Sequence, residues 1–189
     1  LPKPFSEYAL ADWLRLRPLA HRLKQARYDS VDARYRRLPA RAGDPHSLAP
    51  IIAGRQVMVT VAFEDAQAIE WQSQLLRRFV GEPLYVIADN SRSEAGAAAI
   101  EAVARSEGRP YLRLPGNPWT GHAPSRSHGL ALNWLWANLI RPAAPSAFGF
   151  LDDDLFPTAP DDPFARLARQ PVMGGLRRAD HRWFLWAGF

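Results

Sequence analysis

The sequence contains no cysteine, which excludes disulfide bonds, a thiolate metal site and a cysteine nucleophile. No apolar run approaches the roughly 18 residues that a membrane-spanning helix requires. The glycine-rich loop of P-loop nucleotide-binding proteins and the G-x-S-x-G motif of serine hydrolases are also missing. Any chemistry must therefore depend on oxygen and nitrogen side chains. Because the lack of cysteine fits a reducing compartment, we expect a cytoplasmic location, with membrane association as the alternative.

The excess of positive charge lies in the first segment of the chain. The formal net charge is +5 and the pI is about 10.1. Residues 1–41 hold ten Lys and Arg against four Asp and Glu, whereas the rest of the chain holds fourteen against fifteen. The main body is close to neutral, so we do not expect it to bind nucleic acid.

Residues 1–50 are expected to form a basic helical extension and a linker. The apolar side chains recur at the spacing of an amphipathic helix, at Leu10, Trp13, Leu14, Leu16, Leu19 and Leu23. Pro18 should break or kink this helix. Residues 38–50 are rich in Pro, Ala and Gly and predict the linker. The simplest expectation is a helix that packs on the body, and the alternative is a basic surface that contacts an anionic membrane or a partner.

From residue 51 onward, short apolar stretches alternate with longer segments of helical character. We expect strands at 57–63, 84–88, 111–114 and 147–151. We expect helices at 65–79, 93–108 and 124–140. Nearly continuous apolar strands that alternate with helices predict an α/β fold, in which helices cover both faces of a mostly parallel sheet.

Acidic residues follow three of the predicted strands. Glu64 follows the first strand, Asp89 follows the second, and Asp152–Asp154 follow the fourth. The carboxyl ends of parallel strands meet at one edge of the sheet, where open α/β sheets bind their ligands. We therefore expect these carboxylates to converge on one cleft.

The three consecutive aspartates predict a cation site. If the fourth strand stays extended, Asp152 and Asp154 face the same way and Asp153 faces the other way. Two carboxylates on one side, with no thiolate nearby, suit Mg²⁺ or Mn²⁺. The alternative is an acidic turn that lies in water.

Four segments resemble, in their order and spacing, the nucleotide-sugar-binding half of GT-A glycosyltransferases, and glycosyltransferase family 2 above all. They are VIADNSRSE, GNPWTGHAPSRSHGLALNWLW, FGFLDDDLFP and VMGGLRR. The resemblance covers about residues 55–189 and implies a GT-A-like, Rossmann-like domain at 51–189. It implies a metal-dependent glycosyltransferase that uses Mn²⁺ or Mg²⁺ and a UDP- or GDP-sugar donor. The acceptor is unknown.

The resemblance also implies roles for individual residues. Asp89 would contact the nucleoside, and Asp152 and Asp154 would form the D-x-D motif, with Asp152 nearer the ribose and both on the metal. The full set implied to bind the nucleotide sugar is Ala62, Glu64, Asp89, Asn90, Ser91, Asn117, Gly121, Arg126, Asp152 and Asp153. Ser127 stands where the family usually has Asn. Gly174 and Gly175 resemble the next strand of the family, at the edge of the sugar and acceptor site.

The chemistry of a nucleotide sugar accounts for such a motif. The diphosphate is the leaving group, and a divalent cation that bridges its oxygens neutralises the charge that grows as the glycosidic bond breaks. Arg126, near the start of a predicted helix, would add positive field, and its alternative is a solvent-exposed side chain. The family carries its general base well downstream of D-x-D. The chain ends near the expected start of the acceptor half, so the sequence identifies no catalytic residue.

Other classes explain the sequence less well. A haloacid-dehalogenase-like phosphohydrolase also has D-x-D at a strand end but needs a later Lys, and no Lys follows Asp154. A nucleotidyltransferase would need a glycine-rich loop after the first strand, where the sequence is FEDAQA. A non-catalytic nucleotide- or partner-binding module, recruited through the basic N-terminal arm, is the alternative from another class.

Overall fold

The computed structural model describes residues 3–81 and 83–165, and Gly174 and Gly175 lie outside this part of the chain. The chain divides into two compact units, Leu1–Leu38 and Pro39–Phe189. We describe each unit by itself. None of the helices in the described ranges combines the length and the apolar character needed to cross a membrane.

The N-terminal unit is helical. It contains the short 3-10 helix η1 (Phe5–Glu7) and the α-helices α1 (Leu10–Leu14) and α2 (Arg17–Tyr35). The break between α1 and α2 falls at Leu16, which adopts a left-handed conformation with φ of 53°. Pro18 lies in the first turn of α2, where the missing N–H of proline leaves no helix hydrogen bond unmade. The predicted break in the helix is confirmed, but it falls at Leu16, just before Pro18.

The stretch predicted as a linker contains a helix. Helix α3 spans Pro45–Ile52. The Asp44 carboxylate caps it by accepting hydrogen bonds from the backbone N–H groups of His46 at 3.0 Å and Ser47 at 3.2 Å. An Asp N-cap followed by Pro at the first helical position is a strong start signal. The linker prediction was wrong over this range because it relied on composition and overlooked this signal.

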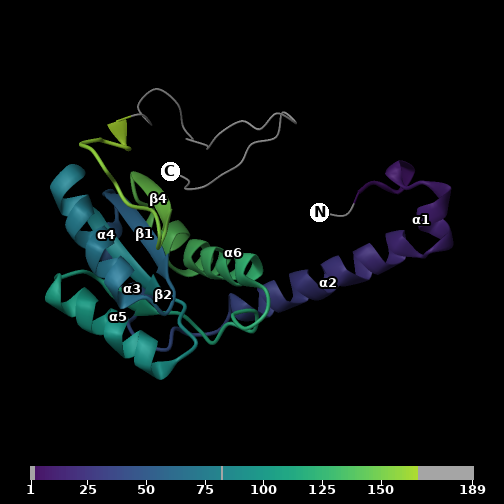
Figure 1. Cartoon of the computed structure of the whole chain (residues 1–189), viewed down its shortest axis with the longest axis horizontal. Helices are drawn as coiled ribbons and strands as arrows, with labels where there is room; N and C mark the ends of the chain where they lie inside the picture. The colour runs from purple at the N-terminus through teal and green to yellow at the C-terminus, as the bar shows by residue number, and fades with distance from the viewer. Residues whose placement is uncertain (1–2, 82, 166–189) are drawn as a thin grey trace. The chain divides into compact units, whose positions relative to one another are not determined.

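The second unit is an α/β fold with a four-stranded parallel sheet (Figure 1). The strands are β1 (Gln56–Ala62), β2 (Leu84–Asp89), β3 (Tyr111–Arg113) and β4 (Ala147–Asp152). The helices after α3 are α4 (Ala66–Phe79), α5 (Glu94–Ser106) and α6 (Pro124–Leu135), then the π-helical turn η2 (Trp136–Ile140) and the short α7 (Arg141–Ala143). The predicted fold class is confirmed, and every strand end lies within one residue of its predicted position.

Helices cover both faces of the sheet, because alternate residues of its strands point to opposite sides. On one face, Met58 and Tyr85 pack with Ile69 of α4 and Ile100 of α5. On the other face, α6 contacts β1 and buries Trp134. Figure 1 shows α4 and α5 on one side of the strands and α6 on the other.

The strand order is β3-β2-β1-β4, so the chain moves outward from β1 through β2 to β3 and then crosses to the other side of β1 for β4. The order therefore reverses between β1 and β4, which is the position where open α/β sheets bind ligands. Ala62 pairs with Asp89, and Val61 pairs with Asp152. Since these pairs lie in register, the acidic ends of β2 and β4 flank the end of β1.

Candidate functional site

A small cavity opens at the carboxyl ends of β1, β2 and β4, at the point where the strand order reverses. Its volume is about 180 Å³. The residues that line it come from the ends of three strands, the loop before α6 and the first turns of α6: Val61, Phe63, Asn90, Thr120, Pro124, Ser127, His128 and Asp153. Asn90 and Asp153 were among the predicted site residues. Sequence reasoning missed Phe63, which belongs to no recognisable motif, and Thr120, which lies inside a resembling segment but was given no role there.

The three aspartates do not alternate as expected. Strand β4 ends at Asp152, and Asp153 and Asp154 lie in a turn, so the two-residue alternation of a strand does not extend past Asp152. Asp153 lines the cavity and accepts a hydrogen bond from the backbone N–H of Phe63 at 3.0 Å. Asp154 is exposed. The prediction that Asp153 points away from the site is corrected: its side chain reaches back to the end of β1.

Asp152 contacts the first turns of α6. Its Oδ1 lies 3.2 Å from Nε2 of His128, and both side chains are partly exposed. His128 also lines the cavity. The three aspartates Asp152–Asp154, which we call the acidic turn, and α6 therefore face each other across the cavity. A protonated His128 would form an ion pair with Asp152.

The pKa of the Asp153 carboxyl is raised. Burial raises its pKa above the ordinary value of 3.8, the hydrogen bond from Phe63 opposes this, and the negative charges of Asp154 and Asp152 raise it further. A bound cation would remove this repulsion. Without one, keeping the Asp153 carboxyl ionised destabilises the fold.

We expect Asp153→Asn to lose less stability than the parent when the pH rises from about 4 to 7 in the presence of EDTA. As the pH rises, the Asp153 carboxyl loses its proton in the unfolded chain before it does so in the native parent, because its pKa is raised in the native state. The free energy of unfolding of the parent therefore falls as the pH rises from the unfolded pKa through the folded pKa. Asn cannot ionise, and its amide oxygen can still accept from Phe63. Thermal unfolding across this pH range measures the difference, with Glu70→Gln on the exposed surface of α4 as the control. Parallel pH profiles for all three proteins would contradict the assignment.

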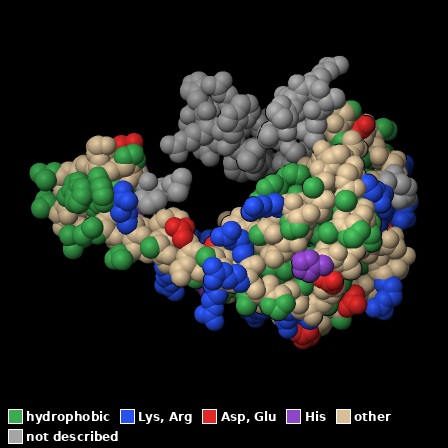
Figure 2. Space-filling view, turned by 180° about the vertical axis from the view of Figure 1, so that it is seen from behind, with side chains coloured by type: hydrophobic (Ala, Val, Ile, Leu, Met, Phe, Trp, Pro, Cys, Tyr) green, Lys and Arg blue, Asp and Glu red, His purple; other side chains and the backbone are tan. Residues whose placement is uncertain are grey.

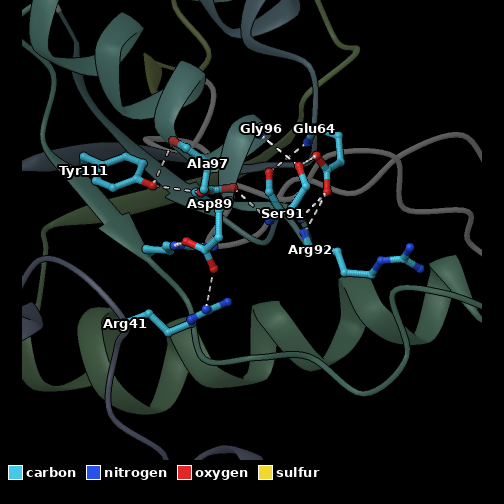
Figure 3. Close-up of polar contacts among 11 residues, drawn as sticks. Arg41, Glu64, Asp89, Ser91, Arg92, Gly96, Ala97 and Tyr111 are labelled. Atoms are coloured by element: carbon cyan, nitrogen blue, oxygen red, sulfur yellow. Dashed lines mark hydrogen bonds and ion pairs between the residues drawn. The ribbon is translucent and has the colours of Figure 1, made fainter.

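Asp89 closes β2 and is 1% exposed. Its Oδ1 accepts a hydrogen bond from the backbone N–H of Ser91, and its Oδ2 accepts one from the Tyr111 hydroxyl, both at 2.8 Å. Burial and this hydrogen bond to Asp89 raise the pKa of Tyr111. Figure 3 shows Asp89 between Tyr111 and Ser91. In this structure, Asp89 supports the loop after β2, and its contact with a nucleoside stays a prediction.

Glu64 ties the end of β1 to the loop after β2 (Figure 3). Its carboxylate accepts hydrogen bonds from the backbone N–H groups of Arg92 at 2.8 Å and Ser93 at 2.7 Å, and from the Ser93 hydroxyl. Burial raises its pKa, but these hydrogen bonds outweigh burial, so the pKa lies below its ordinary value. Gly96 leaves room for this contact, since a Cβ there would lie 2.1 Å from Oε2 of Glu64. The structure thus shows Glu64 organising the loop.

A hydrogen-bond network joins the loop before α6 to the end of β2. The Asn90 amide donates to the Ser127 hydroxyl at 2.9 Å. The Asn117 amide donates to Oδ1 of Asn90 at 3.1 Å and to the backbone carbonyl of Ser127 at 2.9 Å. Because Asn90 and Ser127 are both buried, this network fixes the wall of the cavity. Ser127, at the position where we noted a serine in place of asparagine, is a member of this network.

The remaining predicted residues lie around the same edge. Ala62 is buried, and its carbonyl accepts a hydrogen bond from the backbone N–H of Asn90 at 2.8 Å. A Cβ on Gly121 would lie 3.4 Å from Nη1 of Arg92, so Gly121 approaches the loop after β2. Arg126 is exposed in the first turn of α6. The ends of β1, β2 and β4 thus meet at one edge, but of the carboxylates predicted to converge on one cleft, Asp153 is the one among the described residues that lines the cavity. Ligand contacts by these residues stay predictions.

Gln72 of α4 is a buried support of the acidic turn that the sequence did not reveal. Its side-chain amide donates hydrogen bonds to the carbonyl of Asp152 at 2.8 Å and to that of Leu155 at 2.6 Å. Its own oxygen accepts from the Tyr85 hydroxyl at 2.6 Å. Gln72 thus spans the turn at both ends. Its sequence context, a glutamine in an ordinary amphipathic helix, carries no signal for this role.

The residues present could supply part of the ligands of a metal ion, with a bound phosphate supplying others. Those that the structure describes do not form a metal site made of protein ligands alone. Among residues 3–81 and 83–165, no group of three or more His, Cys, Asp or Glu side chains could hold a metal ion. Mg²⁺ usually keeps several waters and binds through one or two carboxylates plus substrate phosphates, and Mn²⁺ accepts the same oxygen ligands. Asp152 is partly exposed beside His128 of the cavity lining, and Asp154 is exposed in the turn that follows, so both carboxylates are open to solvent.

A larger cavity of about 540 Å³ lies between α4 and residues 155–163. Its lining is mostly apolar, and Asp161 is its one charged side chain among the described residues. It lies away from the carboxyl ends of β1 and β2. We therefore place the site at the smaller cavity, where the polar groups converge.

No family model and no curated protein sequence matches the chain. Among solved structures, the chain is similar to a mannosyltransferase from Pyrobaculum calidifontis in complex with GDP-mannose and Mn²⁺. The identity is 14% and the TM-score is 0.44, over 89% of this chain and 47% of that chain. The chain thus spans less than half of the length of that protein.

Proposed function

We propose that this chain forms the donor-binding part of a GT-A-type glycosyltransferase, which transfers a sugar from a nucleotide diphosphate sugar with the help of Mn²⁺ or Mg²⁺. One observation carries the proposal. The turn of three aspartates lies beside a cavity at the reversal point of a parallel sheet, and the first turns of α6 lie on the other side of that cavity.

This arrangement suits a diphosphate bound to a cation. Helix α6 begins at Pro124 without a side-chain cap, so its N-terminal end presents partial positive charge at the cavity. Asp152 and Asp154 would hold the cation, which when bound neutralises the charge of the departing diphosphate. The cavity is smaller than the roughly 300–1,000 Å³ of sites that enclose a small ligand. We therefore assign only the diphosphate region to it.

The nucleoside would lie along the loop after β2. Asn90 is the residue of that loop that lines the cavity, and its amide is oriented by Ser127 and Asn117. Glu64 and Asp89 hold the loop from either side, through hydrogen bonds to Ser93 and Ser91. These contacts fix the loop before any ligand arrives, which reduces the ordering cost of binding. The acceptor and the general base are not assigned to the described residues.

Calorimetry with the full chain tests the proposal. We expect UDP or GDP to bind at least about tenfold more tightly with Mn²⁺ or Mg²⁺ than with EDTA, because the cation offsets repulsion between the phosphates and the acidic turn. Comparison of UDP, GDP and their sugars identifies the preferred base. Equal affinity with and without metal for every nucleotide would overturn the proposal, and favour a metal-independent binding module.

A further inference from the structure

The N-terminal unit carries a group of exposed apolar side chains that the proposed function does not use. We call it the apolar cluster; its members are Phe5, Leu10, Trp13, Leu14, Leu16, Leu19 and Leu23, which are 39–78% exposed. They lie within η1, α1, the turn at Leu16 and the start of α2. Figure 2 shows hydrophobic side chains gathered at this end of the unit.

Local contacts organise the apolar cluster. The rings of Phe5 and Trp13 lie 5.5 Å apart, and those of Tyr8 and Trp13 lie 6.5 Å apart. The guanidinium of Arg22 lies 3.9 Å above the Phe5 ring. The cluster is therefore a defined surface that mixes aromatic rings, leucines and cationic groups.

Positive charge surrounds this surface. Residues 3–38 hold nine Lys and Arg against four Asp and Glu. Two of these acids, Asp12 and Asp32, form ion pairs with Arg17 and Arg36. Exposed basic residues are interspersed with the leucines, at Arg15, Arg22, Lys24 and Arg27.

We propose that the N-terminal unit docks on an anionic lipid bilayer, with the apolar cluster among the headgroups and acyl chains and the Lys and Arg side chains at the lipid phosphates. Exposed leucines with aromatic rings, flanked by excess positive charge, are typical of segments that lie in a membrane interface. The long basic side chains can keep their charges at the phosphate level while their stems lie along apolar surface. A second copy of the unit fits less well, because it would bring an equal excess of positive charge into the contact.

Co-flotation of the full chain with vesicles tests this proposal. The vesicles contain phosphatidylcholine alone, or roughly three parts of phosphatidylcholine to one of phosphatidylglycerol. We expect binding to the mixed vesicles at least about tenfold stronger than to the neutral ones, with a decrease at high salt. Leu14→Ser should weaken binding by about tenfold, because the free energy of transferring a leucine side chain from water to an apolar environment corresponds to about that factor. Arg15→Gln should weaken it by about fivefold.

Matched variants outside the apolar cluster serve as controls. Trp71 is 52% exposed on α4, and Arg141 is exposed at α7. Trp71→Ser and Arg141→Gln should bind vesicles like the parent, and circular dichroism confirms that every variant is folded. Equal binding to both kinds of vesicle, or the same loss in the control variants, would overturn the proposal. It would also be overturned if the parent bound no vesicles. If the parent then self-associated and Leu14→Ser abolished the self-association, a second copy of the chain would be identified as the occupant.

Discussion

Asp154→Asn should abolish most of the stabilisation that metal plus nucleotide gives to the protein. The substitution keeps the shape of the side chain but removes the charge that attracts a cation. At a hundredfold excess of ligand over its dissociation constant, the parent should gain roughly 2.7 kcal/mol by mass action, and the variant should gain little. Without ligand, the variant should unfold at the same temperature as the parent or slightly higher, because repulsion within the three aspartates is relieved. Thermal unfolding with and without Mn²⁺ and nucleotide measures both effects.

The control for this experiment is Glu70→Gln, which removes an exposed carboxylate from α4. It should show the full gain of the parent. Asp154 is exposed in the turn after β4, so a folding defect is not expected from its substitution. If Asp154→Asn unfolds the ligand-free protein, the acidic turn is a structural cap. If it keeps the full gain, the cation is held elsewhere.

The strands and their common edge could be predicted because the signals are local. The buried parallel strands are continuous apolar stretches, and Asp89 and Asp152 stand at the ends of two of them. The parallel arrangement then requires that these ends meet. The course of the chain after Asp152 could not be predicted in the same way. It depends on hydrogen bonds to Gln72 and to Phe63, which are 80 and 90 residues away in the sequence.

The other predictions also depend on whether the signal is local in the sequence or arises only in the folded structure. The break near Pro18 follows from the covalent structure of proline, so the sequence alone was sufficient. The helix that starts at Pro45 was missed although its cap at Asp44 is equally local. The roles of Glu64 and Asp89 in holding the loop after β2 required the folded structure, since the same carboxylates could equally have faced a ligand.

Gln72→Leu should destabilise the protein by about 3 kcal/mol, because the buried Tyr85 hydroxyl loses its acceptor and the partly buried Leu155 carbonyl loses its donor. For a body of this size, that loss corresponds to a fall in Tm of roughly 6–12 °C. The carbonyl of Asp152 loses one hydrogen bond but still accepts from the backbone N–H of Leu155. Far below its Tm, the variant should also bind metal and nucleotide more weakly, because the acidic turn is no longer held at both ends.

Gln74→Leu on the exposed side of the same helix is the matched control and should change Tm little. The double variant Gln72→Leu, Tyr85→Phe should recover part of the lost stability relative to Gln72→Leu alone, because it removes the hydroxyl that the first substitution leaves without its acceptor. Chemical unfolding of the three variants measures the free energies, and calorimetry with GDP and Mn²⁺ measures binding. Equal losses of unfolding free energy for Gln72→Leu and Gln74→Leu would show that the hydrogen bonds of Gln72 do not contribute to stability. A large stability loss with unchanged nucleotide affinity would separate the acidic turn from the binding site.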